Sequence, residues 1–255
     1  MTGNYHTHTT RCGHAIGSDH AYVETAIVRG LKTLGFSEHV PMPFPDGHES
    51  SYRVPRRLLD DYVTSILSLR EEYRDRIEIR LGFEAEYYPD LFDDMLDMLR
   101  PYPVDYLLLA QHFVDSSERV YNTNPQNSET ALVLYTDRCL EAMRTGRFTY
   151  LAHPDLFFYT GKPDIYRKEV TRLCLGAKEL RIPLEINLLG LREHRNYPSP
   201  QFWEIAGSLG CPAVLGCDAH SPADVADPDN LKAAEAFAKR FGIQPLADVP
   251  LRKPF

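Results

Sequence analysis

The sequence predicts an α/β protein built on parallel strands, and three observations lead to this prediction. Short apolar or β-branched runs recur along the chain and alternate with longer stretches of helical spacing, which is the rhythm of consecutive β/α units. Imidazole and carboxylate side chains follow most of these runs, as they do where parallel strands open onto a site. The length of 255 residues and the 43% hydrophobic content suit one barrel-sized domain spanning residues 1–255.

Seven runs are expected to form the strands, with ends defined to within a few residues. In chain order they are Gly3–Thr7, Thr33–Ser37, Glu78–Phe83, Asp105–Ala110, Phe148–Leu151, Pro183–Ile186 and Ala213–Gly216.

Two of the intervening helices carry clear local signals. A helix is expected from about Pro200 to Leu209, because Ser199 before Pro200 is a typical start and Gly210 a typical stop. Another is indicated by apolar residues that recur every three or four positions and form one stripe for packing on a sheet. That stripe consists of Leu58, Tyr62, Ile66, Leu69 and Tyr73.

Composition narrows the range of partners. The formal net charge of −8 argues against a basic groove for nucleic acid, while a small anion could still bind where metal ions supply positive charge. No secretory signal or membrane span is apparent, so we expect a cytoplasmic protein without a membrane partner. The five cysteines are odd in number and form no C-x-x-C pair, so neither disulfides nor a cysteine-based zinc site is expected. Nothing in the sequence indicates the oligomeric state.

Six of the seven expected strands end in imidazole or carboxylate groups. Such groups are costly to bury unless they are paired or bind metal. His6 and His8 are two residues apart, so both side chains leave the same face of a strand, as a chelating pair requires. The six strand ends carry His6-Thr7-His8, Glu38-His39, Glu84-Ala85-Glu86, Gln111-His112, His153-Pro154-Asp155 and Asp218-Ala219-His220.

These groups predict a centre with more than one metal ion. Imidazole and carboxylate suit Zn, Fe or Mn, and a carboxylate such as Glu84 can bridge two ions. Nine candidate ligands exceed the needs of one ion. They are His6, His8, His14, His39, Glu84, His112, His153, Asp218 and His220.

The remaining polar residues near these positions receive simpler interpretations. His20, His48 and His194 are expected to be solvated or to support the ligands from outside. Glu86 is expected to support a ligand or to bind a substrate ammonium group. Asp155 fits a turn or a helix cap.

Together these residues resemble the PHP (polymerase and histidinol phosphatase) family, and within it the histidinol-phosphatase branch. The resemblance extends over nearly the whole chain and implies a distorted (β/α)7 TIM-like barrel. It is carried by His6-Thr7-His8, Cys12-Gly13-His14, Gly35-Phe36-Ser37-Glu38-His39, Gly82-Phe83-Glu84, Gln111-His112, His153-Pro154, Glu185-Ile186-Asn187 and Asp218-Ala219-His220.

The resemblance also implies how three divalent ions would be held. One ion would be bound by His6, His8, Glu84 and Asp218. Glu84 would bridge to a second ion, bound by His112 and His153. The third would be bound by His14, His39 and His220.

The activity implied is hydrolysis of L-histidinol phosphate to L-histidinol and phosphate, a step of histidine biosynthesis, by attack of a metal-bound hydroxide. Glu84, Asp218 and His220 are the expected catalytic residues. Arg192 is expected to bind the substrate phosphate, and Lys162 to take the place of a family arginine as a point charge. The acid that protonates the leaving group stays open among bound water, a carboxyl and an imidazole.

Three alternatives remain open on the sequence. The protein could hydrolyse another small phosphomonoester, or nucleotide phosphodiesters as polymerase-associated relatives do, although the acidic charge balance disfavours nucleotides. It could also be a metal-binding module without catalysis, which the intact ligand set disfavours.

Overall fold

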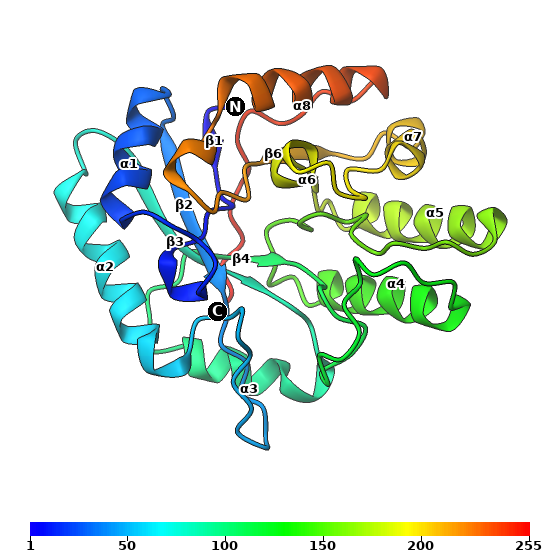
Figure 1. Ribbon diagram of the computed structural model, residues 1–255, viewed down its shortest axis with the longest axis horizontal. Coiled ribbons are helices and arrows are strands. Elements are labelled where there is room, and N and C mark those ends of the chain that lie inside the picture. The colour runs from blue at the N-terminus through cyan, green and yellow to red at the C-terminus, as the bar shows by residue number, and fades with distance from the viewer.

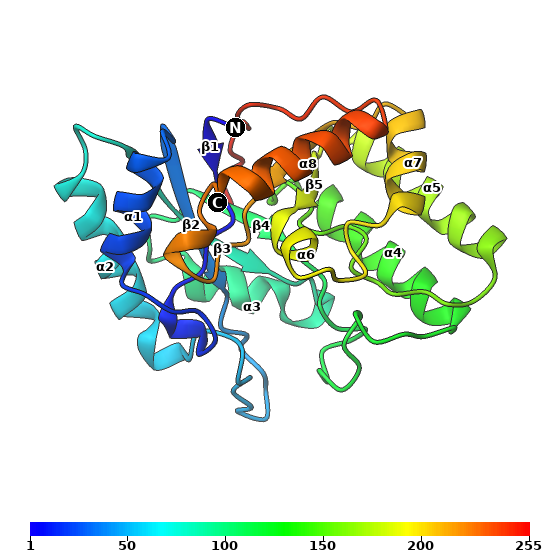
Figure 2. The same ribbon diagram turned by 45° about the horizontal axis from the view of Figure 1, so that its top comes forward.

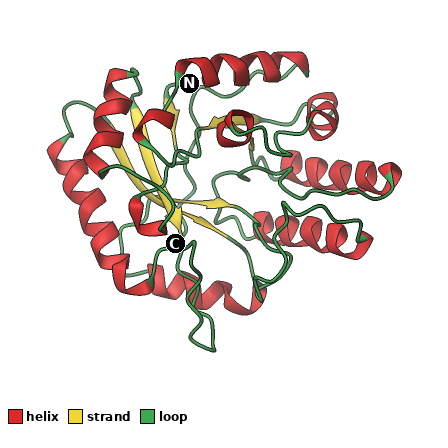
Figure 3. Cartoon of the chain, in the orientation of Figure 1, coloured by secondary structure: helices red, strands yellow, loops and turns green.

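A computed structural model describes residues 1–255. Figure 1 shows helices arranged around a central group of strands, and the same division is clear by secondary structure in Figure 3. The strands are β1 (Gly3–Asn4), β2 (Thr33–His39), β3 (Glu78–Ala85), β4 (Tyr106–Leu109), β5 (Leu184–Asn187) and β6 (Ala213–Gly216). The α-helices are α1 (Asp19–Val28), α2 (Leu59–Glu72), α3 (Pro89–Leu99), α4 (Glu129–Arg144), α5 (Pro163–Glu179), α6 (Leu188–Arg192), α7 (Pro200–Ser208) and α8 (Pro228–Arg240).

All strand pairings are parallel, and backbone pairing continues around the barrel. Strands β1 to β4 pair in sequence order, as do β5 and β6. Leu151 joins the two sheets through parallel bridges to Leu109 and Leu184. The ring closes where Thr7 pairs with Ala219. The predicted α/β class and distorted TIM-like barrel are therefore confirmed, and the view in Figure 2 shows the helices surrounding the strands from a second direction.

The fifth expected strand, Phe148–Leu151, is the element that departs most from prediction. It does not form a continuous strand, although Thr149 and Leu151 still donate backbone hydrogen bonds to Leu107 and Pro183. The chain leaves the extended conformation at His153, where φ is +27°. The segment is thus a brief bridge between two sheets rather than a full strand.

Successive side chains along a strand point to opposite sides of the sheet, and they contribute to two separate hydrophobic cores. A cluster of 58 buried residues, including Leu107 and Leu109, fills the layer between the strands and the helices. A cluster of eight, including Tyr106 and Leu108, packs inside the barrel. Gly82 leaves room for this inner core, because a Cβ there would lie 2.4 Å from the Tyr106 ring.

The two helices with explicit sequence signals are confirmed. Of the expected stripe, Tyr62, Ile66 and Leu69 are buried on α2 and Tyr73 is buried directly after it, whereas Leu58 precedes the helix and is partly exposed. Helix α7 begins at Pro200 after Ser199, as expected. No helix in the structure is both long enough and apolar enough to cross a membrane.

Candidate metal centre

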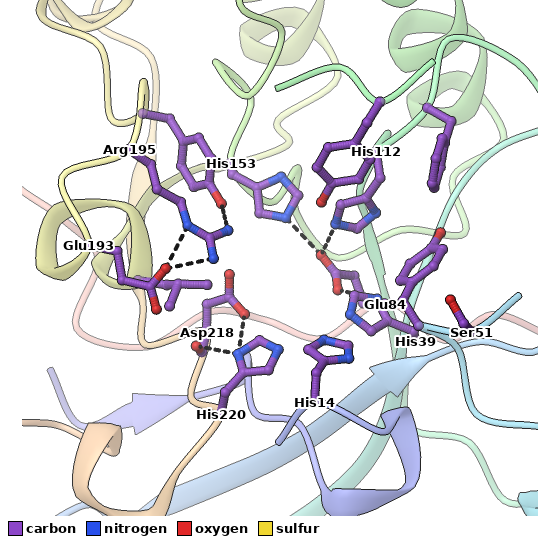
Figure 4. A pocket seen from close by; sticks show the side chains of 15 residues that line it. His14, His39, Ser51, Glu84, His112, His153, Glu193, Arg195, Asp218 and His220 are labelled. Carbon is purple, nitrogen blue, oxygen red and sulfur yellow. Dashed lines mark hydrogen bonds and ion pairs between the residues drawn. The ribbon is translucent and has the colours of Figure 1, made fainter. Parts of the chain in front are cut away.

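The carboxyl ends of the strands converge on one pocket of about 600 Å³. Seven of the nine expected ligands line it, and Figure 4 shows them gathered around the pocket and pointing toward one another. His6 and His8 lie beneath this layer and are fully buried. The structure therefore brings together all nine side chains that the sequence singled out. The seven lining residues are His14, His39, Glu84, His112, His153, Asp218 and His220.

His6, His8, Glu84 and Asp218 form a compact donor set. The Nε2 atoms of His6 and His8 lie 3.5 and 3.2 Å from Asp218 Oδ1, and 3.3 and 3.5 Å from the two oxygens of Glu84. Four ligands at the usual 2.0–2.2 Å from a tetrahedral ion are separated by about 3.4 Å. Both Nε2 atoms are buried without a hydrogen-bond partner, so these residues fit a metal ion.

Glu84 lies at the middle of the cluster with its two oxygens facing different groups. Its Oε1 is 2.8 Å from His153 Nε2 and 3.5 Å from His112 Nε2. Its Oε2 is 2.9 Å from His39 Nδ1. This arrangement supports a bridging carboxylate, because each oxygen can serve a separate ion.

The expected ligands of the third ion form a layer of imidazoles at the pocket surface. The His14 ring centroid lies 4.8 Å from that of His220 and 5.5 Å from that of His39. Donor atoms of His8, His39 and His220 all lie within 4.8 Å of one another, as do those of Cys12, His14 and His220. This layer can hold an ion, and Cys12 is a nearby donor that the sequence interpretation did not include.

Glu185 and Asn187 hold the ligands from behind, and neither was predicted to act there from its residue chemistry. The fully buried Glu185 lies 2.7 Å from His6 Nδ1 and accepts a 3.0 Å hydrogen bond from the His153 backbone. Asn187 donates to Asp218 at 3.1 Å. Gly216 on the neighbouring strand leaves the space for Glu185, since a Cβ would lie 1.7 Å from its Oε1. A glutamate inside an otherwise apolar strand was a signal that could have identified this role.

Glu86 supports His112, one of the two uses expected for it. Its Oε1 lies 2.9 Å from His112 Nδ1 and also accepts a hydrogen bond from Tyr52. Arg53 forms a buried ion pair with the same carboxylate. Burial opposes ionisation of Glu86, but Arg53 and His112 outweigh it and lower its pKa to about 2.

Replacing Glu86 with glutamine should weaken the second ion, because His112 loses the carboxylate that orients its ring. Such changes usually cost about 10- to 100-fold in metal affinity, and metal analysis after dialysis at graded free zinc would measure it. Glu78→Gln, at the exposed start of β3, the strand that ends just before Glu86, is the matched control. Equal metal retention in both variants would contradict the role.

Protonation in the metal-free protein shows how strongly the cluster demands positive charge. Burial lowers the pKa of His8, but Asp218 and Glu38 raise it overall to about 9. Burial likewise disfavours the charged form of Glu84, yet His6, His112 and His39 hold its pKa well below its usual range. Burial and the nearby His8 lower the pKa of His39 to about 3. Protons on the buried imidazoles of His6 and His8 therefore supply positive charge that bound metal ions would otherwise supply.

Metal affinity should consequently fall as pH falls. Below pH 9 His8 must release a proton before its nitrogen can bind an ion. The pKa of His6 is also well above its ordinary value, because Glu185 and Asp218 raise it more than burial lowers it. His6 therefore releases a second proton when the ion binds. We expect zinc affinity, measured by chelator competition, to drop about 10- to 100-fold per unit between pH 8 and pH 6. His20→Gln, at an exposed site, should keep this slope. A zinc affinity of the wild type that does not change with pH would contradict the prediction.

The two residues expected to bind phosphate lie elsewhere. Lys162 is exposed and pairs with Glu129 at 2.9 Å, and Arg192 lies 3.3 Å from Asp224. Neither lines the pocket, whereas Arg195, which the sequence interpretation did not select, does. The only available signal was its position in the loop after the sixth run.

The other polar residues largely follow the simpler interpretations. His20 is exposed on α1 and His48 lies in a loop, half exposed. Asp155 caps α7, accepting hydrogen bonds from the Ser199 backbone and the Trp203 indole. Burial raises the pKa of Asp155 to about 7.

Comparison with known proteins places these features in a family. A "probable histidinol-phosphatase" of Deinococcus radiodurans is 29% identical over 237 residues, covering 88% of this chain and 89% of the relative. The "histidinol-phosphatase" of Bacillus subtilis is 28% identical, covering 92% and 97%.

Solved structures share the fold. The histidinol phosphate phosphatase of Lactococcus lactis, complexed with zinc, L-histidinol and phosphate, superposes with a TM-score of 0.71 at 22% identity, covering 97% of this chain and 96% of that one. A putative histidinol phosphatase of Listeria monocytogenes gives a TM-score of 0.72 at 20% identity, covering 90% and 99%. The PHP domain model matches residues 4–188. Because this match spans more than half of the chain, the protein belongs to the PHP domain family.

Proposed function

We propose that this protein is a metal-dependent phosphomonoesterase that hydrolyses L-histidinol phosphate to L-histidinol and phosphate. The observation that carries the proposal is the cluster of nine imidazole and carboxylate ligands, seven of which line one open pocket together with a guanidinium. The names of the two relatives, each matched over most of its length, support this substrate among phosphomonoesters. Three divalent ions, drawn from Zn, Fe and Mn, would occupy the three donor sets described above.

Arg195 is well placed to bind the phosphate. Its Nε and Nη2 lie 2.8 and 2.7 Å from Glu193 Oε2, and its Nη1 donates to the Tyr197 hydroxyl at 2.8 Å. A guanidinium has five N–H groups, so one hydrogen on Nη1 and one on Nη2 stay free. Two parallel N–H groups match two phosphate oxygens. Glu193 and Tyr197 therefore hold the fork in one orientation.

The protein supplies binding and orientation for the reaction. Bound divalent ions would stabilise charge on the phosphoryl oxygens. They would also lower the pKa of a water molecule, so that a hydroxide nucleophile is available near neutral pH. Glu84 and Asp218, both buried at the base of the pocket, fix where that charge lies. His220 lies at the pocket surface, where it either holds an ion or exchanges a proton.

The rest of the pocket suits a small organic group. Its neutral wall is formed by Ser51, Tyr52, Phe113, Tyr121, Leu189 and Tyr197. Aromatic faces of this kind can pack against the ring of a substrate while their hydroxyls hydrogen-bond its polar atoms.

A substrate panel tests the proposal. The purified protein, loaded separately with Zn, Mn or Fe(II), would be assayed by phosphate release with L-histidinol phosphate, simple phosphomonoesters and nucleotide diesters. We expect kcat/KM to be highest for L-histidinol phosphate by at least about tenfold. A higher value for a diester would overturn the proposal, and turnover of none would favour a non-catalytic metal protein.

A further inference from the structure

Two charged side chains line the pocket outside the expected metal ligands, and they are neighbours. Arg195 carries the positive charge and Glu193 the negative charge, while the other remaining lining residues are neutral. The pocket thus presents a cation and an anion side by side, in addition to the metal centre. This pattern matches a ligand that carries both a phosphate and an ammonium group.

We infer that Glu193 binds the ammonium group of the substrate, so that the pocket is selective for phosphate esters of amino alcohols. The inference rests on the proposed phosphatase function and adds a binding subsite to it. L-Histidinol phosphate is one member of this substrate class, since its amine lies on the carbon next to the one that bears the phosphate ester.

Hydrogen bonding leaves Glu193 free to take this role. Both contacts from Arg195, at 2.8 and 2.7 Å, reach the same carboxylate oxygen, Oε2. The other oxygen, Oε1, accepts no hydrogen bond within the protein, and the side chain is 46% exposed. An ionised carboxylate accepts bonds at both oxygens, so Oε1 can receive an ammonium group without disturbing Arg195.

The position of Glu193 fits the short distance between the two charges of such a substrate. Figure 4 shows Glu193 and Arg195 adjacent to each other near Asp218, across the pocket from Ser51 and Glu84. A phosphate held by the free edge of Arg195 places the neighbouring carbon, and hence the amine, close to this ion pair. The same carboxylate repels the phosphate of any ester, and an ammonium group on the ester offsets that repulsion. An ester without an ammonium group is therefore disfavoured, which adds selectivity.

Glu86, the carboxylate that the sequence suggested as an ammonium ligand, is already occupied. His112, Tyr52 and Arg53 contact its oxygens, and it is buried away from the pocket lining. Among carboxylates in the pocket, Glu84 and Asp218 face the imidazole cluster. Glu193 is therefore the carboxylate with a free oxygen for a substrate amine.

Paired substrates that differ only in the amine test this subsite. The metal-loaded wild type and Glu193→Gln would be compared on L-histidinol phosphate against 3-(imidazol-4-yl)propyl phosphate, and on O-phosphoethanolamine against ethyl phosphate. Calorimetric titration with L-histidinol in the presence of phosphate would measure amine binding without turnover. Glu204→Gln, an exposed glutamate on α7, is the control.

We expect Glu193→Gln to lower kcat/KM about 10- to 100-fold for the amine-bearing esters, the usual effect of a hydrogen bond to a charged group. The amine-free esters should lose clearly less, because their loss reflects only the weaker support of Arg195, and L-histidinol binding should weaken by the same factor as the amine-bearing esters. Equal losses on both members of each pair, with unchanged L-histidinol binding, would overturn the subsite and leave Glu193 as a positioning residue for Arg195.

The outcome also separates this inference from the proposed function. If the wild type prefers O-phosphoethanolamine over L-histidinol phosphate and Glu193→Gln removes the preference for amines, the subsite stands and the substrate assignment falls. If L-histidinol phosphate is the best substrate but the variant keeps its amine preference, the substrate assignment stands and the subsite falls. A wild type that shows no amine preference and binds L-histidinol no better than the variant overturns the subsite.

Discussion

Replacing Glu84 with glutamine should remove two ions together and lower phosphatase activity by about 10³-fold or more. Its Oε1 faces His153 and His112, while its Oε2 faces His39 and His8. In the glutamine variant, the amide nitrogen replaces the oxygen that binds one ion. The loss of the negative charge also weakens binding of the other ion. Metal ions commonly contribute several kcal/mol to such reactions, and each 1.36 kcal/mol is a factor of ten in rate.

The measurement has two parts. Metal per chain would be determined by elemental analysis after dialysis, and kcat/KM by phosphate release with saturating metal present. Glu78→Gln, at the exposed start of the same strand, should match the wild type in both. Full metal content in Glu84→Gln would contradict a bridging role even if activity fell.

The positions of the expected ligands follow from the sequence because they depend on a simple geometric rule. Parallel strands of a barrel place their carboxyl ends at one mouth, so residues as distant as His8 and His220 must become neighbours; their rings lie 4.3 Å apart. Period-two spacing likewise predicts that His6 and His8 point to one side, and both Nε2 atoms face Asp218 although β1 itself ends at Asn4. Neither step required knowledge of loops.

Residues beyond the strand ends follow loop paths that the sequence does not specify. Helix α6 begins directly after β5, because the Asn187 side chain caps it at Gly190, and it directs Arg192 toward Asp224. Three residues later the chain returns, and Arg195 enters the pocket. The same limitation affected Lys162, which precedes α5 and pairs with Glu129 on α4.

Removing all metal should abolish phosphatase activity while leaving the barrel folded. The larger hydrophobic core of 58 residues lies between strands and helices, apart from the ligand cluster, so far-ultraviolet circular dichroism should be preserved. The melting temperature should still fall, because an ion that binds only the folded state stabilises it by mass action. The metal-free protein also buries the unpartnered Nε2 atoms of His6 and His8, which is costly without a ligand.

The experiment is exhaustive dialysis against a chelator, confirmed by elemental analysis, followed by addition of Zn, Mn or Fe(II). Activity should fall to the assay background and return on metal addition, together with the melting temperature. A sample dialysed without chelator controls for handling losses. Activity that persists after complete metal loss would exclude metal-assisted hydrolysis. Lost activity that metal cannot restore, with an altered circular dichroism spectrum, would instead show that the ions are needed to keep the strand ends in place.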